Sequence, residues 1–369
     1  MTPIRILVVD DSVVLRKVLS DTLAEDRALE VVGAASDGRL ALAKIPLLKP
    51  DLITLDIEMP VMNGLETLAV IRQLYPRLPV IMFSVLTERG AAAALDALAL
   101  GASDYATKPS NTSPELAIEC IRLELIPKIK ALCGFAPQEV PRVTRPRSAP
   151  KVRDRANWRI EVVAIGASTG GPNALGEVLP RIPQDFPAPI VVVQHMPPIF
   201  TRQLAERLSR QSAICVEEGS ADAILSPGHA WIAPGDSHMK VTRRGVNWCL
   251  NLDQGPKVNS CRPAVDVLFR SVALAYGAKV LGVVMTGMGT DGVLGAQEIC
   301  DAGGDVIVQD EASAVIWGMP GAVHTLGISD GAYPLDRLAA EITRRVRRSR
   351  GPDGPVDAES CATLEHRAK

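Results

Sequence analysis

One pattern repeats along the chain: short runs rich in valine, isoleucine and leucine alternate with stretches that follow a helical period. In the first part of the chain these runs lie at 4–9, 31–34, 51–56, 79–84 and 102–109. Such an alternation of strands and helices predicts a parallel, doubly wound α/β sheet. Ligands bind such sheets at the carboxyl ends of the strands, so the polar residue that ends each run is a candidate for function.

Carboxylates and a lysine stand at those strand ends. Asp10 and Asp11 follow the first run, Asp56 ends the third, Ser84 ends the fourth and Lys108 lies at the end of the fifth. Three converging carboxylates repel one another unless they share a cation, and an all-oxygen ligand set favours Mg²⁺. A carboxylate beside Mg²⁺ and a lysine can accept a phosphoryl group, because both cations stabilise the charge on the transferring oxygens.

This set resembles the receiver domain of two-component response regulators. The resemblance implies that Asp56 accepts phosphate from a histidine kinase and that Asp10 and Asp11 hold Mg²⁺ together with Asp56. It also implies that Ser84 hydrogen-bonds the phosphoryl group and that Lys108 pairs with it. The match extends to further motif residues, which are Met59-Pro60, Asn63-Gly64, Pro109 and the aromatic Tyr105. An aromatic at this position takes part in switching in that family. Tyr105 could equally be a half-buried aromatic of a strand, without a role in switching.

A second feature lies at 161–172, where a β-branched run stops at glycine, serine and threonine before a helical pattern begins. A strand, a tight turn and a helix there would lift Ser168 out of the strand end. The pair Gly170-Gly171 would let a substrate approach the backbone closely. A serine beside the N–H groups of a helix start suits acyl transfer. A glycine-rich turn can equally bind a phosphate or simply form the corner, so this stretch alone leaves both readings open.

The sequence that follows this turn predicts a second parallel α/β unit, with strands within 188–198, 278–292 and 305–310. His195 and Asp291 follow two of these strands and could meet Ser168 at one edge of the sheet. An imidazole near neutrality can take the serine proton, and a carboxylate can fix its tautomer. His238 could also line the cleft, and Asp266 is expected to be solvated or to cap a helix. The other competing residues are His229, His324, His366, Asp253 and Asp310.

This unit resembles the catalytic domain of the chemotaxis protein-glutamate methylesterases. That resemblance implies Ser168 as nucleophile, His195 as base and Asp291 as the residue that orients the base. It places Thr169 and the backbone of Met288 near the oxyanion and requires no cofactor for the esterase. The motifs that carry it are 166–171, 194–197, 233–235 with 238–239, 262–263 with 265–269, 286–289 with 291–292, and 309–311 with 318–320. Ala264 stands where the family usually has serine, which affects substrate contacts and leaves the triad intact.

Receiver and esterase units together form the full-length arrangement of that family. The resemblance implies hydrolysis of glutamate methyl esters on chemoreceptors, with deamidation of receptor glutamines by the same route. It also implies that the first unit covers the cleft and releases it when Asp56 is phosphorylated. The expected partners are a histidine kinase and the cytoplasmic domains of chemoreceptors. A serine hydrolase of the same fold in a sensory pathway other than motility is the alternative.

The expected organisation is a (βα)5 receiver at 1–130, a linker at 131–158, a Rossmann-like hydrolase domain at 159–350 and a disordered tail at 351–369. The proline- and arginine-rich linker is expected to be a solvated tether, with docking to an acidic partner as the alternative. A net charge of −2 gives no reason to expect nucleic-acid binding. Neither a dinucleotide G-x-G-x-x-G fingerprint nor a basic recognition helix is evident. Seven scattered cysteines and the lack of a long apolar run indicate a cytoplasmic protein without membrane insertion.

Overall fold

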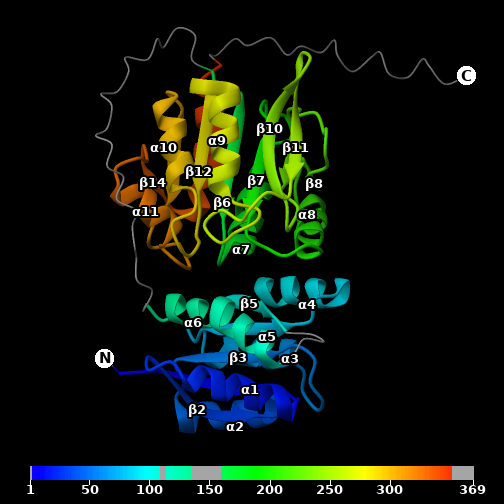
Figure 1. Ribbon diagram of the computed structural model, residues 1–369, viewed down its shortest axis with the longest axis vertical. Helices are drawn as coiled ribbons and strands as arrows, with labels where there is room; N and C mark the ends of the chain where they lie inside the picture. Colours follow the sequence, from blue (N-terminus) through cyan, green and yellow to red (C-terminus); the bar gives the residue numbers. More distant parts are fainter. Residues whose placement is uncertain (1, 109–113, 135–158, 351–369) are drawn as a thin grey trace, which may run out of the picture.

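The computed structural model describes residues 2–108, 114–134 and 159–350. Figure 1 shows two α/β units stacked along the long axis, the first in blue to cyan and the second in green to red. The predicted linker beyond residue 134 and the predicted tail lie outside the described residues.

The first unit has a five-stranded parallel sheet in the order β2-β1-β3-β4-β5, which confirms the predicted doubly wound fold. Strands β1, β3 and β4 are buried because each carries an almost unbroken apolar run, whereas the edge strand β2 is partly exposed. The order reverses at β1, so the ends of β1 and β3 form one crevice. The elements are β1 (Ile4–Val9), α1 (Val13–Ala24), β2 (Leu29–Ala35), α2 (Gly38–Leu48), β3 (Leu52–Asp56), α3 (Gly64–Leu74), β4 (Val80–Ser84), α4 (Glu88–Ala99), β5 (Asp104–Thr107), α5 (Pro114–Cys120) and α6 (Ile126–Leu132).

The second unit has a seven-stranded parallel sheet in the order β14-β13-β12-β6-β7-β9-β8. Strand β6 pairs with β12 on one side and with β7 on the other, in parallel both times. Its elements are β6 (Val162–Ala167), α7 (Gly171–Val178), β7 (Ile190–Gln194), α8 (Phe200–Gln211), β8 (Cys215–Glu218), β9 (His229–Ile232), β10 (His238–Arg244), β11 (Asn247–Asp253), α9 (Val265–Tyr276), β12 (Val280–Val284), α10 (Val293–Asp301), β13 (Asp305–Gln309), α11 (Met319–Thr325), β14 (Ala332–Tyr333) and α12 (Leu335–Arg348).

The parallel sheet of the second unit confirms the prediction, and the structure adds one element that the sequence analysis did not include. Strands β10 and β11 form a separate antiparallel hairpin that stands beside α9 (Figure 1). Its turn contains Gly245 at φ 60°, a conformation that glycine adopts without steric cost. Met239 and Val241 turn one apolar face of the hairpin to the core, which explains why a two-stranded element is stable there.

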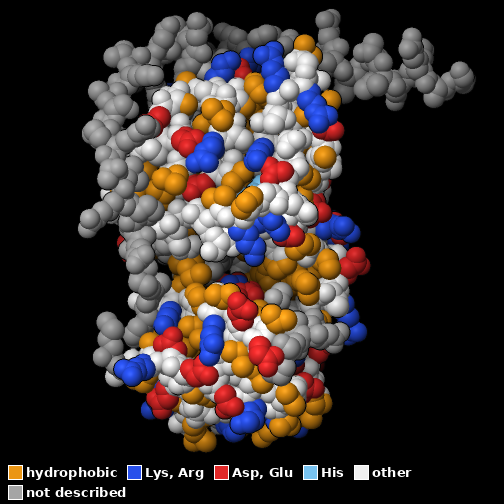
Figure 2. All heavy atoms as spheres, viewed as in Figure 1, with side chains coloured by type: hydrophobic (Ala, Val, Ile, Leu, Met, Phe, Trp, Pro, Cys, Tyr) orange, Lys and Arg blue, Asp and Glu red, His pale blue; other side chains and the backbone are white. Residues whose placement is uncertain are grey.

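The two units share an apolar interface. Tyr105 at the end of the first sheet stacks on Phe200 of α8, with ring centroids 4.7 Å apart and an interplanar angle of 10°. Leu98 of α4 and Leu204 of α8 belong to the same buried cluster. In Figure 2 hydrophobic side chains gather along the boundary between the two units. The carboxyl ends of the second sheet therefore face the first unit.

Helix α9 covers the second sheet and anchors the hairpin, and Phe269 on its inner face is fully buried. We predict that Phe269→Ala lowers the free energy of unfolding of this unit by about 3–5 kcal/mol, because it leaves a cavity that a packed core fills only partly. Denaturant unfolding followed by tryptophan fluorescence measures this unit alone, since every tryptophan of the chain lies after residue 157.

Leu274→Ala on the same helix is the matched control. That side chain is 81% exposed, so its removal should change stability by less than about 0.5 kcal/mol. Equal losses in the two variants would contradict the assigned packing of α9.

Candidate active site

Three neighbouring strands deliver the predicted triad. Ser168 follows β6, His195 follows β7 and Asp291 lies in the loop after β12. Because β6 pairs in parallel with both other strands, their carboxyl ends meet at one edge of the sheet. The backbone holds this register beyond the strands, since His195 N–H donates to Ala167 O at 3.1 Å and Ser168 N–H donates to Thr286 O at 3.0 Å.

His195 and Asp291 form a direct pair. Nε2 of His195 lies 2.8 Å from Oδ2 of Asp291, and the side chains are 13% and 3% exposed. A carboxylate only accepts hydrogen bonds, so Nε2 carries the proton and Nδ1 is the atom that can accept one. Burial favours the neutral imidazole and lowers its pKa, but the hydrogen bond that His195 donates to Asp291 and the contact with Cys261 outweigh the effect of burial. The pKa of His195 is therefore raised above its usual value of 6.5.

Asp291 is held as an anion by several donors. The backbone N–H groups of Val265 and Asp266, at the start of α9, donate to it at 2.6 and 3.1 Å. Asn259 Nδ2 donates at 2.8 Å, and the same amide also reaches Asp266. Burial would raise the pKa of Asp291, but its hydrogen bonds from His195 and from the helix start keep that pKa below its usual range.

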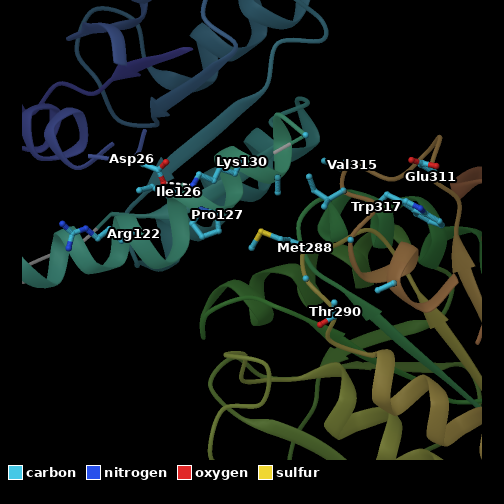
Figure 3. Close-up of a pocket in the computed structure, with 16 residues that line it drawn as sticks. Asp26, Arg122, Ile126, Pro127, Lys130, Met288, Thr290, Glu311, Val315 and Trp317 are labelled. Carbon is cyan, nitrogen blue, oxygen red and sulfur yellow. Dashed lines mark ion pairs between the residues drawn. The ribbon is translucent and has the colours of Figure 1, made fainter. Parts of the chain in front are cut away.

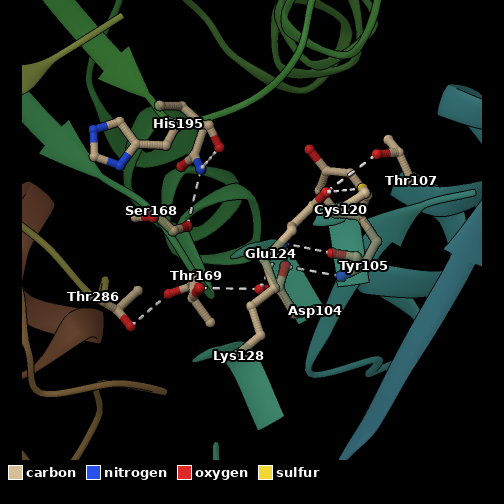
Figure 4. Close-up of polar contacts among 11 residues, drawn as sticks. Asp104, Tyr105, Thr107, Cys120, Glu124, Lys128, Ser168, Thr169, His195 and Thr286 are labelled. Atoms are coloured by element: carbon tan, nitrogen blue, oxygen red, sulfur yellow. Dashed lines mark hydrogen bonds and ion pairs between the residues drawn. The ribbon is translucent and has the colours of Figure 1, made fainter. Parts of the chain in front are cut away.

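Ser168 does not complete the triad in this structure. Within the described residues no hydrogen bond joins its hydroxyl to His195, whose Nδ1 instead lies 3.6 Å from the Sγ of Cys261. The close-up in Figure 4 places Ser168 and Thr169 on the loop that faces the first unit. The sequence thus brings the three residues to one edge, while the serine hydroxyl and the imidazole remain unconnected.

The glycine pair after Ser168 has a different role from the expected one. A Cβ at Gly171 would lie 1.9 Å from Oε1 of Gln194, and one at Gly170 would lie 2.7 Å from Val315. Both glycines therefore make room for the protein's own side chains rather than for a substrate. Gln194 uses this space to donate from Nε2 to Ser168 O at 2.9 Å, which fixes the turn.

The competing residues lie elsewhere or do other work. His238 is buried with Nε2 3.0 Å from Pro256 O, and His229 stacks on Trp231. Of the two roles expected for Asp266, solvation is wrong, because the residue is only 2% exposed. Helix capping is confirmed, because the Asp266 carboxylate accepts a hydrogen bond from Gly295 N–H in the first turn of α10 at 2.7 Å. The sequence analysis did not identify Asn259 and Cys261 as site residues. Their position directly before the Arg262-Pro263 motif could have indicated them.

Thr169, expected near the oxyanion, is engaged by the first unit. Its Oγ1 donates to Oδ2 of Asp104 at 3.0 Å, and Asp104 also pairs with Lys128 at 3.3 Å (Figure 4). All three groups are largely buried. Asn173 of α7 donates to Leu98 O at 2.8 Å, so the first unit binds two residues that closely follow Ser168.

Met288, the other residue expected near the oxyanion, lines a cavity of about 1030 Å³ between the two units. Figure 3 shows Met288, Val315 and Trp317 on one wall, and Ile126 and Pro127 of the first unit opposite them. The first unit therefore lies across the strand ends but leaves open space beside Met288.

The carboxylates of the first unit converge as predicted. Ligand oxygens of Asp10, Asp11 and Asp56 lie within 4.8 Å of one another. Lys108 Nζ lies 3.0 Å from Asp10 and 2.6 Å from Asp56. Ser84 points elsewhere in this structure, since its hydroxyl donates to Gly90 O at 2.7 Å.

Charge in this cluster is incompletely balanced. Burial raises the pKa of Asp56 to about 6, against the opposing effect of Lys108 and with a further rise from Asp10. The buried Oδ2 atoms of Asp10 and Asp56 share the single ammonium of Lys108. An oxygen-only cluster in which carboxylates outnumber the cation beside them fits a hard divalent cation such as Mg²⁺.

None of the helices in the described ranges combines the length and apolar character that a membrane crossing requires.

Comparison with known proteins identifies two family models. Residues 163–342 match the CheB methylesterase model and residues 6–117 match the response regulator receiver domain. The protein-glutamate methylesterase/protein-glutamine glutaminase of Trichodesmium erythraeum is 53% identical over 94% of this chain and 100% of its own length. The same-named protein of a Nocardioides species is 49% identical over 98% of this chain and 100% of its own. The solved catalytic domain of Thermotoga maritima CheB methylesterase is 41% identical over 50% of this chain and 97% of its own, with a TM-score of 0.49.

The raised pKa of His195 has a direct test. We expect Asp291→Asn to lower that pKa by at least about one unit, because the imidazolium loses its anionic partner. An NMR titration of the His195 ring protons measures it. Asp253→Asn removes a carboxylate of β11 that pairs with Lys240 and should leave the His195 titration unchanged. A His195 pKa that is the same in Asp291→Asn and in the wild type would contradict the assigned pair.

Proposed function

This chain belongs to the CheB methylesterase family and carries that family's receiver domain, and on this premise we propose how its residues act. The protein is a hydrolase, a phosphorylation-regulated chemotaxis methylesterase that acts on glutamate methyl esters and is also a glutamine deamidase. The observation that supports the mechanism best is the buried His195–Asp291 pair at the strand ends next to Ser168.

We propose that Ser168 is the nucleophile. Its hydroxyl attacks the ester carbonyl while Nδ1 of His195 accepts the proton, since Nε2 is occupied by Asp291. The imidazolium then returns the proton to the departing methanol, and water releases the glutamate by the same route in a second step. With a glutamine substrate the leaving group is ammonia and the steps are otherwise the same.

The missing Ser168–His195 hydrogen bond fits this scheme. In a protein without substrate, catalytic hydrogen bonds are often long or absent and tighten when the substrate binds. Here the turn of Ser168 is also held by the receiver through Thr169 and Asn173. We propose that release of the receiver frees the Thr169 hydroxyl, and that Thr169 and the backbone at Met288 then face the developing oxyanion.

Control by the receiver follows from the position of β5. Lys108, which pairs with Asp56, comes directly after the strand that carries Asp104 and Tyr105. A phosphoryl group on Asp56 would draw Lys108 into new contacts, and the shift would act on the strand end that touches Thr169 and Phe200. Asp10, Asp11 and Asp56 would hold the Mg²⁺ that neutralises charge during phosphoryl transfer.

The partners follow from these two activities in general terms: a kinase that supplies the phosphoryl group and a chemoreceptor that supplies the ester. We propose a histidine kinase and the cytoplasmic domains of chemoreceptors in these roles, and a cytoplasmic location for the protein.

Ser168→Ala should reduce methanol release from methylated chemoreceptors by at least about a thousandfold, because the remaining groups cannot form the acyl-enzyme. Denaturant unfolding followed by tryptophan fluorescence, which should match that of the wild type, serves as the folding control, because the tryptophans report on the unit that carries Ser168. Undiminished methanol release would remove Ser168 from its role.

Asp56→Asn should abolish the stimulation of methanol release by a small phosphodonor and leave the basal rate within about twofold, because the amide cannot form an acyl phosphate. Asp21→Asn, which removes an exposed carboxylate of α1, should retain full stimulation. Stimulation that persists in Asp56→Asn would place the acceptor elsewhere.

A further inference from the structure

Cys261 lies beside the imidazole of His195, at the ring nitrogen that does not pair with Asp291. Its Sγ is 3.6 Å from Nδ1 of His195, and the thiol is partly buried. The general mechanism above needs this nitrogen and makes no use of the sulfur. The two atoms therefore form a nitrogen–sulfur pair to which the esterase reaction assigns no task.

The loop that presents Cys261 is rigid. Val258 and Cys261 exchange both backbone hydrogen bonds, at 3.1 and 2.9 Å. The neighbouring Arg262 is fixed by Asp236 at 2.8 Å and by the carbonyl of Gly255 at 2.9 Å. Asn259, in the same loop, is tied to Asp291. A sulfur held in this way stays close to the imidazole without an entropic cost at the moment of binding.

We propose that His195 Nδ1 and Cys261 Sγ bind a soft divalent metal ion, with Zn²⁺ the best fit, and that this ion inhibits the esterase. Zinc binds imidazole nitrogen at about 2.0–2.1 Å and thiolate sulfur at about 2.3 Å, so a tetrahedral ion separates the two atoms by about 3.5 Å. The observed separation of 3.6 Å is close to this value.

Asp291 orients the imidazole by accepting a hydrogen bond from the other ring nitrogen, Nε2. Histidines that bind zinc commonly donate their other N–H to a carboxylate, which fixes the tautomer and strengthens the ligand. His195 already does so through Nε2 and Oδ2 of Asp291 at 2.8 Å. One candidate ligand atom each from His195, Cys261 and Asp291 lies within 4.8 Å of the other two, and water completes the coordination.

Binding and catalysis exclude each other, because the metal takes the lone pair that must accept the Ser168 proton. The thiol gives its proton to solvent as the ion binds, so affinity increases with pH. The carboxylate cluster of the receiver contains only oxygen ligands and favours Mg²⁺, whereas the nitrogen–sulfur pair favours Zn²⁺ or Co²⁺. The two sites can therefore be occupied separately. The inhibitory part of this proposal rests on the proposed function, but metal binding itself does not.

Co²⁺ is the probe for binding, because a thiolate ligand gives cobalt an intense charge-transfer absorption in the near ultraviolet. Full-length protein with excess Mg²⁺ and a non-chelating reductant is titrated with CoCl₂. We expect the absorption to saturate at one equivalent, to disappear on addition of Zn²⁺ and to be absent from Cys261→Ser. Cys215→Ser, which removes an exposed thiol of β8, should keep the full absorption. Equal absorption in Cys261→Ser and the wild type would overturn the site.

Inhibition is measured as methanol release in increasing ZnCl₂, with each variant normalised to its own metal-free rate. We expect full recovery with EDTA, and an inhibitory concentration at least about tenfold higher in Cys261→Ser than in the wild type and in Cys215→Ser. Equal inhibition of all three proteins would overturn the proposal. If Ser168→Ala kept full esterase activity, the proposed function would fail while the cobalt absorption still reported on the metal site.

Discussion

The parallel pairing of β6 with both β7 and β12 is the constraint on which the site depends. Three chain segments far apart in sequence reach the same edge only because these strands are neighbours and point the same way. Helix α9 then reaches that edge with its first turn, and its N–H groups hold Asp291 ionised. The first turn of α9 thus holds Asp291, so a change in the packing of this helix would also move the His195–Asp291 pair.

The receiver uses the same principle at its own strand ends and adds a charge conflict. Asp10 and Asp56 share one lysine while both are nearly inaccessible. Because these carboxylates repel each other, the cluster carries more negative than positive charge. Binding of a cation and transfer of a phosphoryl group would both change this balance. Lys108 directly follows β5, the strand whose Tyr105 contacts the second unit. A shift of Lys108 in response to the charge on Asp56 would therefore act on the interface through only a few residues.

Much of this arrangement could be predicted from the sequence. The strand ends with Asp10, Asp56 and Lys108 follow from apolar runs that stop at polar residues, and so does the convergence of His195 with Asp291. The hairpin around Gly245 was missed although Trp248, Leu250 and Leu252 alternate there, because the parallel pattern of the flanking segments dominated the interpretation. The positions of Cys261 and Asn259 depend on a loop whose path is set by contacts with Asp236 and Asp291, and no local periodicity encodes such contacts.

The pairing of Asp104 has a consequence for how easily the two units part. Its charged partner Lys128 belongs to the same unit, so that pair stays together whether or not the units touch. What separation breaks at this point is one hydroxyl hydrogen bond, that of Thr169, and water can replace it on both sides. No ion at this contact loses its charged partner, in contrast to the ion pair of Arg207 and Asp96, which the two units share and which separation breaks. Breaking this contact therefore costs little free energy, because water takes the place of each hydrogen-bond partner when the units separate, and the contact can form again when they meet.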